Sequence, residues 1–110
     1  MEELKQFDIV LCNLENSGAF KEYGVRPCIV VSNNACNEFG SIIYVVPLTT
    51  SAKKPMPTHC IISSARVASV ALCENIIGIE RGGVITKQGE LNEFEQMNIL
   101  YCLKQQLGIK

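Results

Sequence analysis

The chain has 110 residues, of which 47% are hydrophobic and 19% are charged, and its formal net charge is −1. This size and composition are those of one folded domain and exclude an intrinsically disordered chain. A net charge near zero excludes a basic surface spread over the whole molecule, so any nucleic-acid site must be a local patch. The apolar runs are far shorter than the roughly 20 residues of a membrane helix, and the charged start is unlike a signal peptide. We therefore expect a cytosolic protein with no membrane contact.

In chain order, three strands are predicted in the first half of the sequence. Phe7–Leu14 and Cys28–Ser32 are apolar runs, and the polar segment Glu15–Val25 between them contains a turn signal. Asparagines and a glycine bracket a short connection over residues 33–40. The third run, Ser41–Leu48, is rich in β-branched residues and apolar on both faces, which predicts either a barrel interior or a dimer interface.

Shorter strands are predicted in the second half. Thr49–Pro57 has no periodicity and holds two prolines, which predicts a loop. Strands are expected at Thr58–Ile62 and Ser69–Asn75, and a short one at Val84–Thr86 after a turn at Gly82–Gly83.

The C-terminal segment changes its period and predicts a helix. Over Asn92–Leu107 apolar residues recur at helical spacing. Asn92 is a suitable N-cap, Glu95 stands where it completes a capping box, and Gly108 follows as a helix-ending glycine. Together the elements predict a mainly β protein, a small antiparallel β-barrel closed by one C-terminal helix, in a single domain over residues 1–110.

Six cysteines are spread along the chain. We expect them to be reduced and buried, because no export signal accompanies them, cytosolic thiols stay reduced, and most lie in apolar segments. They form none of the close pairs that bind zinc, and the chain has a single histidine. The sequence therefore predicts neither disulfides nor a metal or other cofactor.

Positive charge and hydroxyl groups gather in two loops. Residues 18–60 carry four cations against two carboxylates, with an arginine before the second predicted strand and two lysines after the third. Neighbouring antiparallel strands can bring both loops to one end of the barrel, where these side chains would surround an anion. A phosphodiester is the natural candidate, because arginine presents a planar fork of donors. The candidate residues are Arg26, Thr49, Thr50, Ser51, Lys53 and Lys54.

Each candidate also has a purely structural interpretation. An Arg-Pro pair at a strand start is usually a surface turn, adjacent lysines usually lie in a solvated loop, and hydroxyls often form turns. His59 is either a strand histidine or a general base, and Glu74 either faces outward or is buried beside a cation. A Ser-His-Asp triad would need His59 beside Asp8, and no nucleophile elbow or phosphate-binding glycine loop is present.

Six segments, in order and at similar spacing, resemble the MazF/PemK family of toxins from toxin–antitoxin pairs. They extend from about residue 7 to residue 109 and comprise DIVLCNL, GVRPCIVVSNN, IIYVVPLTTS, KKPMPTHCII, SVALCENI and a C-terminal LGI. The resemblance implies an SH3-like barrel of the CcdB/Kid/MazF type and a homodimer that binds single-stranded RNA across its interface. It further implies a metal-independent, sequence-specific endoribonuclease acting on mRNA, in which the substrate's 2′-hydroxyl attacks the adjacent phosphate and leaves 2′,3′-cyclic phosphate and 5′-hydroxyl ends.

The resemblance assigns roles to particular positions. Arg26 matches the family's Arg-Pro arginine, for which the resemblance implies charge stabilisation at the phosphorus, with proton donation to the leaving oxygen as a second candidate role. Thr49 matches the catalytic threonine after the third strand. His59 matches the histidine of a Pro-Thr-His segment that contacts RNA, and Glu74-Asn75 matches the Glu-Gln of one branch. The acid and base of the Kid-like branch have no counterpart, so the general base is not assigned.

Two departures from the family stand out. Phe7 occupies a position that is often glycine, and Phe20–Tyr23 replaces a Ser-Glu-Gln-Gly loop that helps to read bases in relatives. Tyr23 or Phe20 either stacks on an unpaired base or packs the loop onto the barrel. The cleavage sequence is therefore not predicted.

Two other functions are compatible with the same fold. The first is a gyrase poison like CcdB, which ends in Trp-Gly-Ile and uses the tryptophan on its target, whereas this chain ends in Leu107-Gly108-Ile109 and has no tryptophan. The second is a catalytically inactive barrel that binds RNA or a protein. Each toxin function implies a cognate antitoxin whose disordered, acidic-hydrophobic tail folds over the positive loops.

Overall fold

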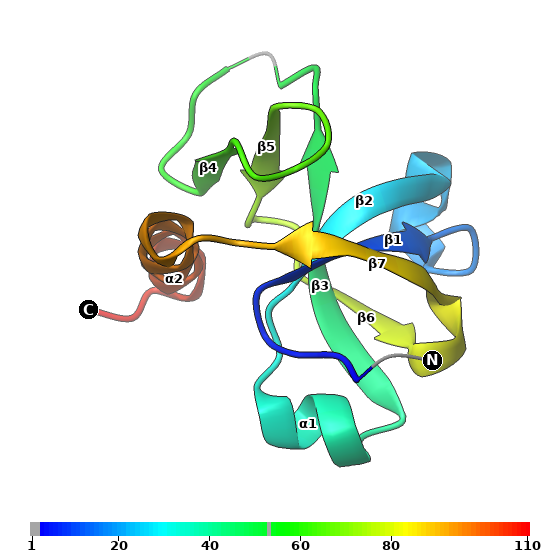
Figure 1. Cartoon of the computed structure of the whole chain (residues 1–110). Helices are drawn as coiled ribbons and strands as arrows, with labels where there is room; N and C mark the ends of the chain where they lie inside the picture. Colours follow the sequence, from blue (N-terminus) through cyan, green and yellow to red (C-terminus); the bar gives the residue numbers. More distant parts are fainter. Residues whose placement is uncertain (1–2, 53) are drawn as a thin grey trace.

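A curved antiparallel sheet with a helix along one side forms the body of the protein, in a computed structural model that describes residues 3–52 and 54–110 (Figure 1). The sheet order is β4-β5-β3-β2-β1-β7, and β6 pairs separately with β3. The elements are β1 (Asp8–Asn13), η1 (Gly18–Tyr23, a 3-10 helix), β2 (Val25–Val30), α1 (Asn34–Phe39), β3 (Ile42–Thr49), β4 (His59–Ile62), β5 (Ser69–Leu72), β6 (Ile77–Glu80), η2 (Arg81–Gly83, a 3-10 helix), β7 (Val84–Glu90) and α2 (Glu93–Leu107).

Strand β3 is the centre of the sheet because it has partners along both edges. One edge pairs with β2, while the other is shared between β6, opposite residues 42–45, and β5, opposite residues 48 and 49. Within the described ranges β6 and β7 do not pair with each other, so the sheet is not a closed hydrogen-bonded ring. The predicted antiparallel barrel with a C-terminal helix is confirmed in this open form.

The long strands are apolar on both faces because the sheet separates two hydrophobic clusters. One cluster lies inside the barrel and includes Val10 and Val45. The other lies between the opposite face of the sheet, α2 and the β4–β5 hairpin, and includes Val46 and Ile99. From Val45 to Thr49, β3 is therefore buried on both faces within one chain, whereas Ile42 and Tyr44 near its start are exposed.

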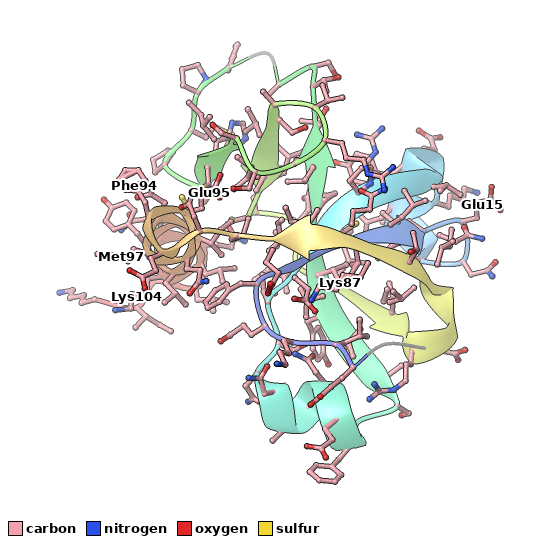
Figure 2. The ribbon with its side chains drawn as sticks, viewed as in Figure 1. Glu15, Lys87, Phe94, Glu95, Met97 and Lys104 are labelled. Carbon is pink, nitrogen blue, oxygen red and sulfur yellow. The ribbon has the colours of Figure 1, made fainter. Side chains whose placement is uncertain are left out.

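Helix α2 begins with the predicted capping box. The Asn92 side chain accepts from the Glu95 amide at 2.8 Å, and the Glu95 carboxylate accepts from the Asn92 amide at 3.1 Å. Gly108 ends the helix with a φ of 69°. Figure 2 shows Phe94 and Met97 projecting away from the body, whereas Glu95 points toward the hairpin. In the part of the chain that the structure describes, no helix is long and apolar enough to cross a membrane.

Several short elements were predicted wrongly. The expected connection over residues 33–40 contains α1, whose N-cap side chain, Asn33, accepts from the Cys36 amide. Strand β6 was missed because it has four residues, one of them Gly78. The strand predicted to reach Asn75 ends at Leu72, where a turn begins. Strand β7 continues to Glu90, since an edge strand that is largely exposed carries little apolar signal.

Phe7 has a φ of 76°, in the left-handed region that favours glycine. Its amide donates to the Val30 carbonyl at 2.7 Å and its carbonyl accepts from the Leu91 amide at 3.1 Å, so both neighbouring segments hold the backbone in place. This conformation gives a physical reason for the glycine that is common here in the family the sequence resembles.

All six cysteines are free, and five are buried, as predicted. Burial raises the pKa of the Cys60 thiol to about 12 and also raises the pKa of Cys102. These thiols are therefore protonated at neutral pH and act as small hydrophobic side chains.

Candidate functional site

Arg26 lies inside strand β2 and not in the loop before it, which corrects the expectation that the strand starts after Arg-Pro. The strand begins at Val25, and Arg26 is paired with Cys12 of β1. Pro27 is tolerated because pairing of β2 with β3 begins only at Cys28, so its missing amide removes no bond from that ladder. The guanidinium is therefore carried by a backbone that the sheet fixes.

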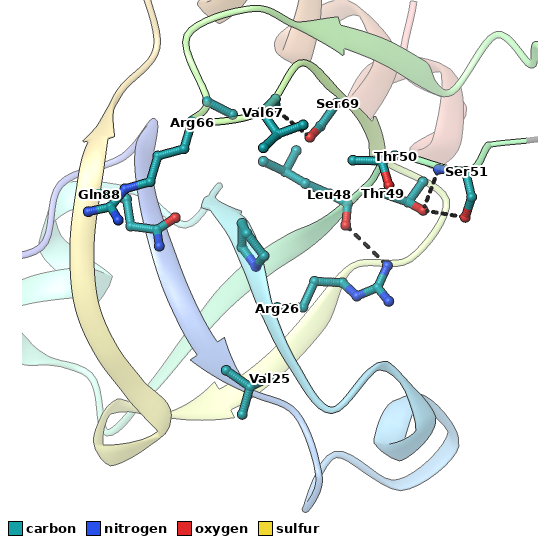
Figure 3. Close-up of a pocket in the computed structure, with 12 residues that line it drawn as sticks. Val25, Arg26, Leu48, Thr49, Thr50, Ser51, Arg66, Val67, Ser69 and Gln88 are labelled. Atoms are coloured by element: carbon teal, nitrogen blue, oxygen red, sulfur yellow. Dashed lines mark hydrogen bonds between the residues drawn. The ribbon is translucent and has the colours of Figure 1, made fainter.

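A pocket of about 330 Å³ opens beside Arg26 (Figure 3). The end of β3 and the loop after it form one wall, and the segment that joins β4 to β5 forms another. The loop after β3 thus meets Arg26 of β2 at one end of the barrel, and the β4–β5 connection lies there in place of the loop before β2. The lining residues that bear on the argument are Arg26, Thr49, Thr50, Ser51, Arg66 and Gln88.

The Arg26 guanidinium is held by neutral groups. Its Nη1 donates to the Leu48 carbonyl at 3.3 Å, its Nε donates to the Tyr23 carbonyl at 3.4 Å, and its central carbon lies 4.8 Å from the centre of the Tyr23 ring. Among the described residues no carboxylate forms an ion pair with it. The charge of this half-buried arginine is therefore free to act on an anion in the pocket.

Thr49 is buried at the end of β3, and its hydroxyl is oriented by the loop that follows. The Ser51 amide donates to Thr49 Oγ1 at 3.2 Å, and the two hydroxyl oxygens are 3.1 Å apart. The amide occupies one lone pair of the hydroxyl, so when Ser51 Oγ is the donor the Thr49 hydrogen is free to donate into the pocket. The pocket is thus lined by both an arginine and a threonine hydroxyl.

Arg66 was not predicted as a site residue, yet it lines the pocket opposite Arg26 (Figure 3). Its loop is anchored by Glu95, whose Oε2 accepts from the Ser63 and Ser64 amides at 2.7 and 3.1 Å. This placement depends on contacts between residues about 30 positions apart, and the sequence offers no local signal for it beyond a lone arginine.

The predicted anion-binding residues also included Lys53 and Lys54. Lys54 is exposed and is not among the residues that line the pocket, and the prediction for Lys53 lies outside the described residues. The positive charge of the pocket comes instead from Arg26 and Arg66.

His59 and Glu74 form a second polar group, on β4 and just after β5. His59 Nε2 lies 3.0 Å from Glu74 Oε2, and the Thr58 hydroxyl donates to Glu74 Oε1 at 2.9 Å. Burial by itself raises the pKa of Glu74, but hydrogen bonds from its own backbone, from His59 and from Thr58 outweigh this effect and hold the pKa below its ordinary value. Glu74 is thus half-buried and hydrogen-bonded to His59 and Thr58.

No Ser-His-Asp triad is formed, because Asp8 lies elsewhere. Its carboxylate accepts from the Lys5 amide at 2.8 Å and pairs with Lys87 at 3.3 Å. Over residues 3–52 and 54–110, no group of three or more His, Cys, Asp and Glu side chains is arranged to hold a metal ion.

A chain of contacts joins the two polar groups. Asn75, next to Glu74, donates from its side chain to the Tyr23 hydroxyl at 2.8 Å, and the Tyr23 ring contacts Arg26. Tyr23 and Phe20 also pack against the cluster inside the barrel. The loop before β2 is therefore bound to both halves of the site.

Comparison with known proteins points to one family. Residues 5–107 match the family described as PemK-like, MazF-like toxin of type II toxin–antitoxin system. The chain is similar to the endoribonuclease MazF of Staphylococcus epidermidis, with 24% identity over 111 residues that cover 96% of this chain and 92% of that protein.

Solved structures agree on the fold. A mycobacterial endoribonuclease in complex with its cognate antitoxin has a TM-score of 0.83 and 25% identity, and the match covers 97% of each chain. MazF from Deinococcus radiodurans has a TM-score of 0.85 at 20% identity, with 99% of this chain and 100% of that chain covered.

Proposed function

The chain belongs to the PemK-like, MazF-like toxins of type II toxin–antitoxin systems, and we propose that it is an endoribonuclease that cleaves single-stranded RNA at the pocket between Arg26 and Thr49. The observation that carries the proposal is the Arg26 guanidinium, which lies on a fixed strand, faces a pocket, and pairs with no carboxylate in the described ranges. The similar proteins from Staphylococcus epidermidis and from mycobacteria are named endoribonucleases. We propose that the protein acts in the cytoplasm, because mRNA, the proposed substrate, is found there.

The proposed reaction uses the substrate's own nucleophile. The 2′-oxygen forms a bond to the adjacent phosphorus while the bond from phosphorus to the 5′-oxygen breaks, which leaves a 2′,3′-cyclic phosphate and a 5′-hydroxyl. One proton leaves the 2′-hydroxyl and one reaches the 5′-oxygen, so the overall charge is unchanged. Arg26 stabilises the negative charge that accumulates on the phosphoryl oxygens, and a preorganised cation is most effective when it needs no rearrangement.

Thr49 assists in the same pocket by donating its hydroxyl to a non-bridging oxygen or to the attacking 2′-oxygen. Thr50 and Ser51 extend this row of hydroxyls along the wall of the pocket. We propose that they bind the RNA backbone, with Lys53 and Lys54 attracting it from the following loop.

We propose that His59 and Glu74 contact the RNA beyond the cleavage pocket. Asn75, the residue after Glu74, donates to Tyr23, whose ring contacts Arg26, so the two polar groups are linked through Tyr23. The ionised Glu74 carboxylate accepts hydrogen bonds and is suited to the amino groups of unpaired bases.

We also propose that residues 1–110 act as one domain that forms a homodimer. Large apolar side chains are exposed along α2 and just beyond it, including Phe94, Met97, Tyr101 and Ile109. An apolar stripe of this kind is typical of a surface that is buried in an assembly. The mycobacterial structure contains a cognate antitoxin, and we propose that this chain likewise has an antitoxin whose disordered tail covers the RNA site.

The test is cleavage of a long single-stranded RNA in EDTA, with the chemistry of the cut ends determined. The wild-type protein is expected to cut at defined sequences and to leave cyclic phosphate and 5′-hydroxyl ends. Arg26→Ala should abolish cutting, whereas Arg81→Ala, which removes an arginine bonded to the Gly40 carbonyl, should cut normally. RNA binding without cleavage by the wild-type protein would instead support an inactive binding barrel.

A further inference from the structure

Tyr23 is the residue of the divergent loop that contacts the most important side chain of the proposed site. It ends η1, three positions before Arg26. The Phe20 ring stacks beside the Tyr23 ring, with centres 6.1 Å apart and planes 8° from parallel. The Arg26 guanidinium lies over the Tyr23 ring, and Asn75 donates to the Tyr23 hydroxyl.

The ring supplies an attraction that the hydrogen bonds of Arg26 do not. The two bonds from the guanidinium are 3.3 and 3.4 Å long, slightly longer than a typical N–H···O hydrogen bond, so they fix its position poorly. An aromatic ring attracts a cation through its quadrupole without cancelling the charge. A carboxylate in its place would hold the guanidinium more strongly but would compete with the phosphate.

We propose that Tyr23 is a positioning residue: its ring holds the Arg26 guanidinium toward the pocket, and Asn75 holds the ring through its hydroxyl. The ring already contacts Phe20 and Arg26, so this role replaces that of a stacking platform for an RNA base. The effect on cleavage rests on the proposed function, whereas the effect on the Arg26 side chain does not.

Two substitutions separate the parts of this arrangement. Tyr23→Phe keeps the ring but loses the bond to Asn75, and Tyr23→Leu loses the ring as well. Tyr44→Leu is the matched control. It removes a half-exposed tyrosine near the start of β3, whereas the pocket lies at the end of that strand. Melting temperatures establish that each variant is folded before its kinetics are compared.

Steady-state cleavage kinetics give the first readout. Tyr23→Leu should lower kcat roughly tenfold with little change in KM, because a cation–π contact orients the guanidinium mainly for the transition state. Tyr23→Phe should have a smaller effect that disappears in an Asn75→Ala background, since both changes break the same bond. A raised KM with unchanged kcat in Tyr23→Leu, or a Tyr23→Phe effect of equal size in both backgrounds, would overturn the proposal.

Nuclear magnetic resonance of the Arg26 side chain gives a second readout that needs no substrate. The ring current of Tyr23 should shift the Arg26 δ and ε protons upfield in the wild-type protein, and Tyr23→Leu should remove this shift while Tyr44→Leu leaves it. Unshifted protons in the wild type would overturn the proposal even if RNA is cleaved. A protein that shows the shift but cleaves no RNA would contradict the proposed function alone.

Discussion

Two charged side chains of this protein are held in opposite ways. Glu95, buried at the start of α2, accepts hydrogen bonds from three backbone amides and from the Ser64 hydroxyl. Arg26, half-buried beside the pocket, contacts two carbonyl oxygens and an aromatic ring, and in the described part of the chain no carboxylate pairs with it.

The two side chains differ in how fully their charge is satisfied within the chain, and this difference distinguishes a structural role from a functional one. A charge whose hydrogen-bonding capacity is filled within the chain stabilises the fold and has little left to offer a ligand. A charge that is fixed in position but not neutralised lowers the stability of the fold somewhat, and the protein recovers this stability only when an anion binds. Proteins tend to break local rules in this way at functional sites. We therefore infer that Glu95 stabilises the structure around the site, whereas Arg26 acts on the substrate.

Removing the Thr49 hydroxyl should give the largest effect on chemistry after Arg26 itself. Thr49→Val keeps the size of the side chain but cannot donate to the phosphate, so single-turnover cleavage should slow roughly 100-fold with a small change in stability. Thr49→Ser, which keeps the hydroxyl, is the control and should retain most of the rate. Equal rates in the two variants would show that the hydroxyl takes no part.

Removing the Glu95 carboxylate should give the largest effect on stability. Glu95→Ala leaves the Asn92, Ser63 and Ser64 amides without their acceptor and should lower the free energy of unfolding by about 2 kcal/mol. Urea unfolding measures this change. Glu93→Ala, at an exposed position in the same helical turn, should change the value by less than about 0.5 kcal/mol.

Arg66 tests whether the pocket has a second cation that acts on the substrate. Arg66→Ala should weaken binding of a non-cleavable RNA about tenfold and reduce the slope of log affinity against log salt concentration by about one, as expected for one lost phosphate contact. Arg81→Ala should change neither quantity. An unchanged salt slope in Arg66→Ala would show that Arg66 does not contact the backbone of the RNA.

The smallest expected effect is a pH dependence of stability. Burial alone raises the pKa of Glu95, but the hydrogen bonds from Ser64, Asn92 and Ser63 outweigh it and hold the pKa below its ordinary value near 4.5. A carboxyl whose pKa is lower in the folded state stabilises the protein above the unfolded value and loses that contribution as the pH falls through the folded value. Unfolding followed from pH 7 to pH 3 should thus lose less stability in Glu95→Gln than in the wild type.

The sequence predicted the features that depend on near neighbours. The capping box of Asn92 and Glu95 is a signal over four residues, and the apolar runs that became β1, β2 and β3 were found with errors of a few residues at their ends. The meeting of Arg26 and Thr49 in one pocket was also expected, because antiparallel neighbours bring loops to a common end.

The features that depend on distant contacts could not be predicted. Arg66 lines the pocket from a loop whose start is held by Glu95 of α2, about 30 positions further along the chain. Tyr23 was left with two interpretations, because the hydrogen bond that holds its hydroxyl comes from Asn75, in the turn after β5 and 52 positions along the chain. Strand β6 was missed because four residues with one glycine carry too little pattern to compete with a loop.

One pair of variants tests the central contrast most directly: Arg26→Gln and Glu95→Gln, each measured for the free energy of unfolding and for single-turnover RNA cleavage per folded molecule. Arg26→Gln should lose more than about 100-fold in cleavage while its stability stays within about 0.5 kcal/mol of the wild type. Glu95→Gln should lose at least about 1 kcal/mol of stability while cleavage stays within about tenfold. An Arg26→Gln variant that is destabilised but still cleaves RNA, or a stable Glu95→Gln variant that does not, would contradict the account.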